Sequence, residues 1–216
     1  AMTFAIAASP ALAQNTDGTA IGLDLSPTPT QVTLSQGALL DVSNDTTQLL
    51  PALSGIRIIG RPEQVAPGGA SANGVEVTTP EIPASVVAAA RSHIGKPLTP
   101  RSLDQLSRSM VIAFREAGLP VVNVVVPPQD ITEGTLQVIA VVARQEDVIV
   151  TGTDNREMIT DGYTIRRGDV LREAPVLDQL RWASRRHNRS VEGIFSPGSA
   201  FGTTDVEFAV TETKPW

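Results

Sequence analysis

The most regular pattern of apolar and polar positions lies between Phe114 and Val142. An amphipathic stretch ends at Gly118, β-branched residues fill Val121–Val126, and a second apolar run fills Leu136–Val142, with two prolines and an acidic turn in between. β-Branched residues favour strands, whereas paired prolines cannot continue a central ladder. The pattern therefore predicts a helix, a strand, a turn and a second strand, which would form a hairpin with the helix laid across it.

The elements that precede this hairpin complete a first unit with the order β-α-α-β-β. Glycines bound a predicted strand at Gly55–Gly60, and one helix is expected from Pro83 to Gly95 because proline suits a first helical turn. A second helix is expected after Thr99, whose side chain can cap its N-terminus. Apolar residues recur along this helix at intervals of three and four, which predicts one buried stripe. The stripe consists of Leu103, Leu106, Met110, Phe114 and Ala117.

The same order of elements recurs in the last third of the chain, where the pattern of apolar and polar positions is less regular. A strand is predicted at Val148–Gly152, a short helix at Asn155–Thr160 and a longer helix at Pro175–His187. Two further strands are predicted at Val191–Phe195 and Asp205–Thr211, separated by a Ser-Pro-Gly turn. The chain is thus predicted to repeat the β-α-α-β-β unit.

The predicted fold class is α+β, with two tandem domains that each have a three-stranded mixed sheet covered by two helices. Two antiparallel helices return the chain to the end of the sheet where the first strand finished. The second and third strands then form an antiparallel hairpin, and the third runs parallel to the first, in the order 1-3-2. The first and second strands are edges, whose unpaired backbone groups can accept a strand of another polypeptide.

The N-terminal part of the chain differs in composition from the two units. A short apolar run ending in Ala-Leu-Ala is typical of a signal-peptidase site, although a disordered apolar terminus is the alternative. A Thr/Pro-rich stretch follows, with one short strand expected near Gln31–Leu34. The predicted organisation is a signal-peptide remnant at 1–13, an extended linker at 14–50, a first domain at 51–145 with an inserted Gly/Pro-rich loop at 61–80, and a second domain at 146–216.

Composition and charge exclude several classes of function. The net charge of −6 argues against nucleic acid as a partner, since such binders need clustered Lys and Arg. The absence of cysteine excludes disulfides, zinc fingers and thiol catalysis. One basic cluster is expected to form a solvated helix face with a favourable charge at the helix C-terminus. It consists of Arg181, Arg185, Arg186, His187 and Arg189.

No set of residues suggests catalysis. The two histidines, His93 and His187, fall at predicted helix ends, far apart in the sequence. Gly68-Gly69 lacks the Lys-Ser/Thr of a phosphate loop, and Ser54 lacks the flanking glycines of a nucleophile elbow. We therefore expect no enzymatic activity, no catalytic residue, no metal site and no cofactor.

The valine hairpin is apolar on both faces, although a small sheet covered on one side should alternate apolar and polar residues. The face expected under the helix carries Val122, Val124, Val126, Leu136, Val138, Ala140 and Val142. The opposite face carries Val121, Val125, Ile139 and Val141. This second face either docks on the neighbouring unit or on residues 14–50, or it is a recognition patch.

Several short motifs resemble those of a known family. Gly95–Thr99 (GKPLT), Val126–Ile131 (VPPQDI), Arg167–Leu171 (RGDVL) and Ser196–Gly198 (SPG) occur in the order found in the POTRA domain pair of two-partner secretion (TpsB) transporters of the Omp85 superfamily, the haemolysin and filamentous-haemagglutinin exporters. The resemblance covers about three quarters of the chain, and its most specific element is the Pro-Pro-Gln-Asp turn.

The chain departs from the family at four points. The usual Val-Glu-Gly junction between the domains is replaced by Val142-Ala143-Arg144, and the first domain carries an insertion. Residues 14–50 lack the amphipathic helix that often fills the barrel pore. The chain stops at Trp216, where such transporters begin their β-barrel, so we expect the periplasmic part of a longer outer-membrane protein.

The resemblance implies a module for protein transport by type V secretion. It would capture an unfolded secreted exoprotein by adding a client strand to an exposed edge and would hand the client to its own C-terminal barrel. The alternatives are a POTRA module of an outer-membrane assembly machine and a spacer that orients the barrel without binding a client. The client-binding residues expected on this basis are Met110, Phe114, Val121, Val122, Asn123, Val124, Val125 and Val126.

Overall fold

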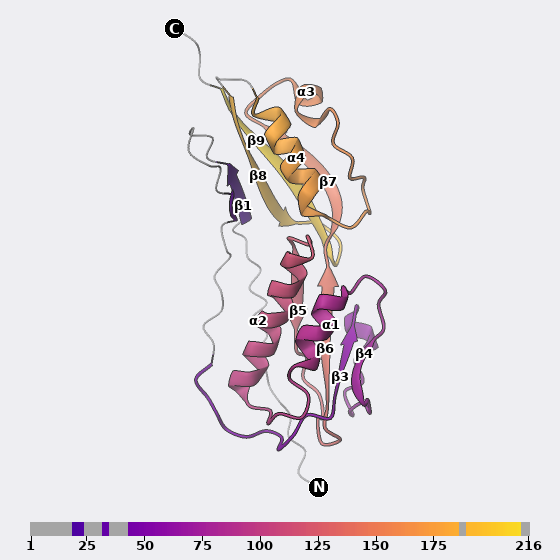
Figure 1. Cartoon of the computed structure of the whole chain (residues 1–216). Helices are drawn as coiled ribbons and strands as arrows, with labels where there is room; N and C mark the ends of the chain where they lie inside the picture. The colour runs from indigo at the N-terminus through magenta and orange to yellow at the C-terminus, as the bar shows by residue number, and fades with distance from the viewer. Residues whose placement is uncertain (1–18, 24–31, 35–42, 186–188, 213–216) are drawn as a thin grey trace. The chain divides into compact units, whose positions relative to one another are not determined.

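The structure is a computed structural model that describes residues 19–23, 32–34, 43–185 and 189–212. The chain divides into two compact units, shown in Figure 1. Of the described residues, 43–142 belong to the first unit, and 19–34 together with 143–212 belong to the second. The predicted signal-peptide remnant lies outside the described residues.

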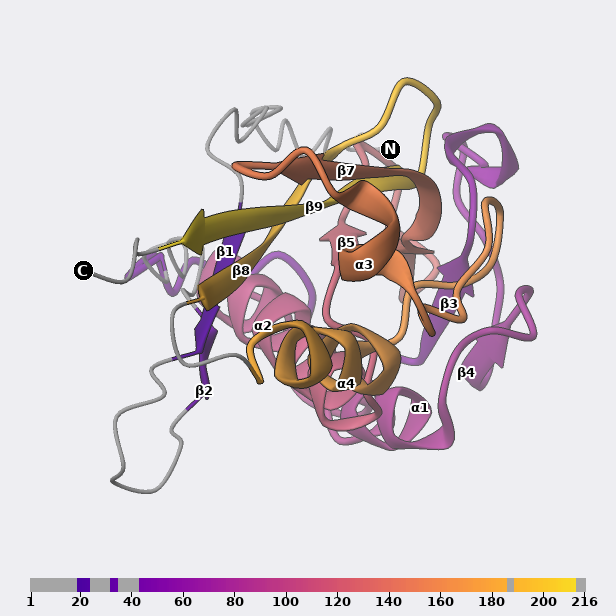
Figure 2. The same cartoon turned by 90° about the horizontal axis from the view of Figure 1, so that it is seen from above.

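The first unit is a four-stranded sheet with two helices on one face (Figures 1 and 2). Its strands are neighbours in the order β4-β3-β6-β5, so that the first, third and second predicted strands are adjacent. β6 runs parallel to β3 and antiparallel to β5. The elements are β3 (Gly55–Ile59), η1 (Pro62–Gln64), β4 (Gly74–Val77), α1 (Ala84–Arg91), α2 (Pro100–Glu116), β5 (Val122–Val125) and β6 (Thr135–Val142).

Local sequence determines where α2 begins and which side it buries. The Thr99 hydroxyl accepts from the Ser102 backbone N–H at 3.1 Å, and the Ser102 hydroxyl accepts from the Thr99 N–H at 2.8 Å. This reciprocal cap satisfies two donors that the first helical turn would otherwise leave unpaired. The predicted stripe is buried against the sheet from Leu103 to Phe114. The helix ends before Gly118, whose φ of 77° suits glycine.

The first sheet has four strands rather than the predicted three, because part of the inserted loop 61–80 is itself a strand. β4 pairs in parallel with β3, and Gly74 N–H donates to Ser54 C=O at 3.1 Å. A parallel neighbour needs a crossover connection, which the residues between β3 and β4 provide. The first predicted strand is therefore not an edge in this unit.

The same insertion covers part of the sheet face opposite the helices. The Gln137 side chain, which is fully buried, accepts from Ala66 N–H and donates to Ala66 C=O. The Thr135 hydroxyl accepts from Ala72 N–H at 3.0 Å. The second face of the sheet is thus partly closed by the insertion, which was not among the coverings expected from the sequence.

The second unit has a five-stranded sheet in the order β2-β1-β8-β9-β7, with both helices on one face (Figure 2). β7 and β9 are parallel, and β8 and β9 are antiparallel. The aromatic rings of Tyr163 and Phe208 meet edge to face in its core, with centroids 5.4 Å apart. The elements are β1 (Thr19–Leu23), β2 (Val32–Leu34), β7 (Arg144–Thr151), α3 (Arg156–Thr160), α4 (Glu173–Ala183), β8 (Arg189–Pro197) and β9 (Thr203–Glu212).

The second sheet also has more strands than the predicted three. β1 pairs antiparallel with β8, and β2 pairs antiparallel with β1. β2 falls within the stretch where a short strand was expected. The N-terminal segment therefore covers the edge that the sequence analysis left open, because that edge offers a row of unpaired backbone groups.

Candidate polypeptide-binding edge

The outer edge of β5 is defined by the direction of the backbone groups in β6. Ser54 and Gly55 donate to Gly134 C=O, so even-numbered residues of this strand direct their backbone groups towards β3. Gln137 directs both its N–H and its C=O to the opposite side, where the Gln129 side chain binds them. Backbone direction alternates along a strand, so odd-numbered residues of β6 face β5.

The same alternation identifies the outward-facing groups of β5. Asn123 lies opposite Val141 and Val125 opposite Ile139, so these two β5 residues direct their backbone groups to β6. Val122 and Val124 therefore direct their N–H and C=O groups away from the sheet. Among the described residues no strand pairs with this side of β5.

Gln129 ends the pairing of β5 with β6. In the register of the hairpin Pro127 would lie opposite Gln137, but proline has no N–H to donate. The Gln129 amide takes that place: it donates to Gln137 C=O and accepts from Gln137 N–H, both at 2.7 Å, and is only 4% exposed. The side chain thus imitates the missing peptide group, which gives the Pro-Pro-Gln-Asp motif a physical reason.

The structure separates the predicted client-binding residues into two groups. Val125 is 44% exposed and Asn123 is exposed, whereas the other valines of the run are half-buried. Met110 and Phe114 are completely buried. The helical stripe that carries them faces the sheet, so the surface of the domain does not expose these two side chains, and their part in client binding stays a prediction. The backbone of β5, rather than the side chains of α2, is what the edge offers to a partner.

The equivalent edge of the second unit carries an added strand. Gly198 N–H donates to Thr203 C=O at 3.1 Å, so even-numbered residues of β8 face β9 and odd-numbered ones face outward. Thr19 lies opposite Phe195 and Ile21 opposite Gly193, both outward-facing residues of β8. This edge therefore accepts an antiparallel strand.

Known structures share this architecture. CdiB from Escherichia coli matches with a TM-score of 0.57 and 18% identity, over 88% of this chain and 30% of that chain. CdiB from Acinetobacter baumannii matches with 0.52 and 18%, over 76% and 30%. The POTRA1-3 region of the periplasmic domain of Omp85 from Anabaena matches with 0.52 and 20%, over 76% and 67%. The fold is that of a pair of POTRA domains.

The sequence itself gives no match, and the structural matches to CdiB cover only part of those chains. No family model matches the chain, and no curated protein matches its sequence. The chain spans less than a third of the length of either CdiB. Within the described residues, none of the helices combines the length and the apolar character that a membrane crossing requires.

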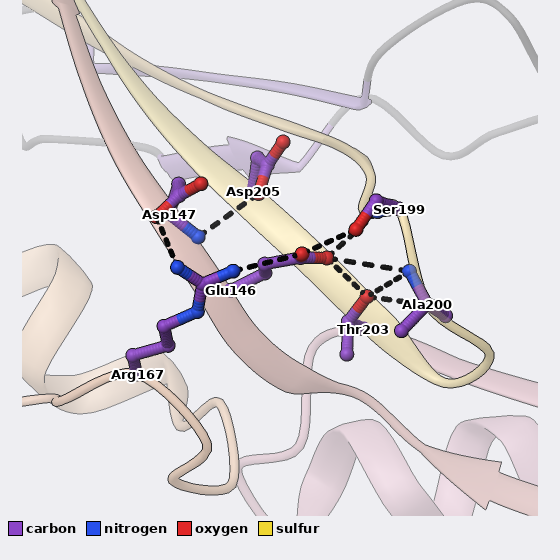
Figure 3. Close-up of polar contacts among 7 residues, drawn as sticks. All are labelled: Glu146, Asp147, Arg167, Ser199, Ala200, Thr203 and Asp205. Atoms are coloured by element: carbon purple, nitrogen blue, oxygen red, sulfur yellow. Dashed lines mark hydrogen bonds and ion pairs between the residues drawn. The ribbon is translucent and has the colours of Figure 1, made fainter.

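A carboxylate holds the turn between β8 and β9 of the second POTRA domain (Figure 3). Glu146, on β7, accepts from Ser199 N–H at 2.7 Å, from both the Ser199 and Thr203 hydroxyls and from Ala200 N–H, and it pairs with Arg167 at 3.1 Å. The Ser199 and Thr203 hydroxyls lower the pKa of Glu146 to about 2. The sequence analysis did not single out Glu146, because its partners in the turn, Ser199, Ala200 and Thr203, lie more than fifty residues away.

The basic cluster differs from the predicted solvated face. Arg189 is 9% exposed and its guanidinium binds the Glu212 carboxylate at 2.7 Å across β8 and β9. Arg181 is exposed and pairs with Asp178 at 3.1 Å. The prediction was wrong for Arg189 because this residue begins a strand rather than ending a helix; Arg186 and His187 lie outside the described residues.

The described part of the POTRA pair shows no arrangement that indicates catalysis. No group of three or more His, Asp or Glu residues there is placed to hold a metal ion. Partial burial, followed by the charge of Lys96, lowers the pKa of His93. A groove of about 560 Å³ between β4 and α1 is lined by residues that do not titrate, namely Val77, Thr78, Thr79, Pro80, Ile82, Ala84 and Val87. This groove therefore offers no general acid or base.

Proposed function

We propose that this POTRA pair is the periplasmic part of an outer-membrane two-partner secretion transporter. It binds the unfolded secreted partner as an added strand on β5 and passes it to a C-terminal barrel. The outward backbone groups of Val122 and Val124 carry this proposal. The added strand on the equivalent edge of the second domain supports it, because it shows how such an edge pairs with an extended segment.

The chemistry of the β5 edge suits a site that binds many client sequences and releases them again. Backbone pairing makes hydrogen bonds that do not depend on the side chains of the client, so many sequences can be bound with modest affinity. Val125 and Asn123 present a small apolar and a small polar side chain beside the edge, and neither is charged. Gln129 limits the length of the site, since it closes β6 where β5 ends.

The order of motifs in the sequence favours the secretion transporter over the assembly machine. Gly95–Thr99, Val126–Ile131, Arg167–Leu171 and Ser196–Gly198 occur in the order that resembles the secretion transporters. The fold is shared with both CdiB and the Anabaena Omp85 domains, so it is compatible with either class.

The decisive experiment compares two prolines at the two edges of one sheet. Val124→Pro removes an outward donor of β5 without removing a hydrogen bond to β6. Val75→Pro is the matched control on β4: Gly74 and Thr78 donate to β3, so Val75 also directs its backbone outward. The probe is a fluorescent peptide of alternating Thr and Val with terminal Lys residues, and reduced, carboxymethylated α-lactalbumin is a second, permanently unfolded probe.

We expect Val124→Pro to weaken binding of both probes about tenfold, since it removes one hydrogen bond and places a ring against the added strand. Val75→Pro should leave binding within about twofold of the wild type. The proposal fails if Val124→Pro binds as the wild type does while its circular dichroism is unchanged. If the wild type and both variants bind neither probe, the result favours the spacer.

A further inference from the structure

The N-terminal strand β1 occupies only part of the outer edge of β8. Three residue pairs join the two strands: Thr19 with Phe195, Ala20 with Ile194 and Ile21 with Gly193. β8 pairs with β9 over nine residues on its other side. β1 therefore pairs with three residues of β8, a strand that is nine residues long.

The part of β8 that β1 does not pair has the backbone groups that a longer strand needs. Odd-numbered residues of β8 face outward, and of these Arg189 and Val191 have no paired residue in β1. Pro197 also faces outward and has no N–H, so it ends the edge at the opposite side. An added strand can thus pair with β8 over more residues than the three that β1 pairs, in the direction of Arg189.

Three residue pairs join β1 to β8 among the described residues. β1 and β2 form a hairpin of five and three residues, and a two-stranded hairpin of this size is marginal by itself. Only the two outward pairs, at Gly193 and Phe195, join it to β8 by backbone hydrogen bonds. A longer segment that also pairs with Val191 and Arg189 would make more of the same bonds.

We propose that the outer edge of β8 is a second binding site for an extended polypeptide, and that residues Thr19–Leu23 occupy it until a client strand displaces them. This inference rests on the proposed function, since it assumes that the protein binds unfolded polypeptide. The partner that fits is a strand antiparallel to β8 and longer than three residues. The N-terminal segment is thereby a competitor that lowers the apparent affinity of the second domain for its client.

A reversible covalent link tests this competition. The chain contains no cysteine, so Ala20→Cys with Ile194→Cys introduces one defined pair. Ala20 and Ile194 are opposite each other at a non-hydrogen-bonded position, where Cα atoms lie about 4.5 Å apart, within the range of about 4.4–6.8 Å that a disulfide spans. Oxidation then fixes β1 on the edge, and a reductant frees it.

The measurement is made in the Val124→Pro background, in which binding at β5 is weakened. The alternating Thr/Val peptide is titrated against the oxidised and the reduced protein, with each single cysteine variant as a control. We expect the oxidised protein to bind the peptide at least tenfold more weakly than the reduced protein, and the reductant to restore binding. Equal binding by the oxidised and reduced forms would overturn the inference.

A second variant tests the inference from the opposite direction. Ile21→Pro removes the N–H that faces Gly193, so it should free the edge and tighten peptide binding at least threefold. Unchanged or weaker binding would overturn the inference. If the wild-type chain binds neither probe, the proposed function fails and this inference with it. If Val124→Pro weakens binding but the remaining binding is insensitive to the disulfide, the function stands and only the second site is refuted.

Discussion

Replacement of Gln129 by alanine should destabilise the first POTRA domain more than its position in a turn would suggest. Among the described residues, this side chain alone binds Gln137 N–H and C=O, at 2.7 Å each, and both glutamines are buried. Alanine leaves one donor and one acceptor without partners, at a cost of about 1–3 kcal/mol each. The expected loss of unfolding free energy is therefore about 2–6 kcal/mol, a large part of the stability of a small domain.

Urea denaturation followed by two signals separates the unfolding of the two domains. Both tryptophans, Trp182 and Trp216, belong to the second unit, so tryptophan fluorescence reports that unit, whereas circular dichroism reports both. With a slope of about 1–3 kcal/mol per molar urea, Gln129→Ala should lower the midpoint seen by circular dichroism by about 1–3 M. The fluorescence midpoint should not move.

The matched control is Gln105→Ala, which truncates an exposed glutamine on α2 and should change the unfolding free energy by less than about 0.5 kcal/mol. A loss below about 0.5 kcal/mol in Gln129→Ala would refute the reasoning. It would mean that water or a shifted backbone satisfies Gln137 as well as the amide does.

Two further predictions concern the second domain and the cap of α2. Glu146 has a pKa of about 2 in the folded chain and about 4.5 as its ordinary value, so its ionised form adds stability above pH 4.5 that is lost as the pH falls towards 2. The difference in Tm between wild type and Glu146→Ala should thus shrink in scans from pH 7 to pH 3, and a constant difference would contradict this. Thr99→Ala removes the acceptor for Ser102 N–H and should cost about 1 kcal/mol in urea denaturation, whereas Thr99→Ser should cost less than half of that.

The helices and hairpins were predictable because their information is local. The three- and four-residue spacing from Leu103 to Phe114 predicts a helix with one buried face, and the structure buries that face. The same spacing places Met110 and Phe114 in the core, where the structure finds them. The Pro-Pro-Gln-Asp motif marked the end of β5, although the sequence does not show which backbone groups the Gln129 amide binds.

The repeated order of strands and helices, and the strand runs themselves, follow from the sequence alone, because apolar periodicity and turn residues act over a few positions. What covers each sheet edge was decided only by the tertiary structure. β1 and β4 come from Gly-, Ala- and Thr-containing segments without a strong strand pattern, and they become strands by pairing with an existing edge far away in the sequence. Such pairing depends on an edge that exists only after the sheet has formed, which is also why the open side of β5 could be located only in three dimensions.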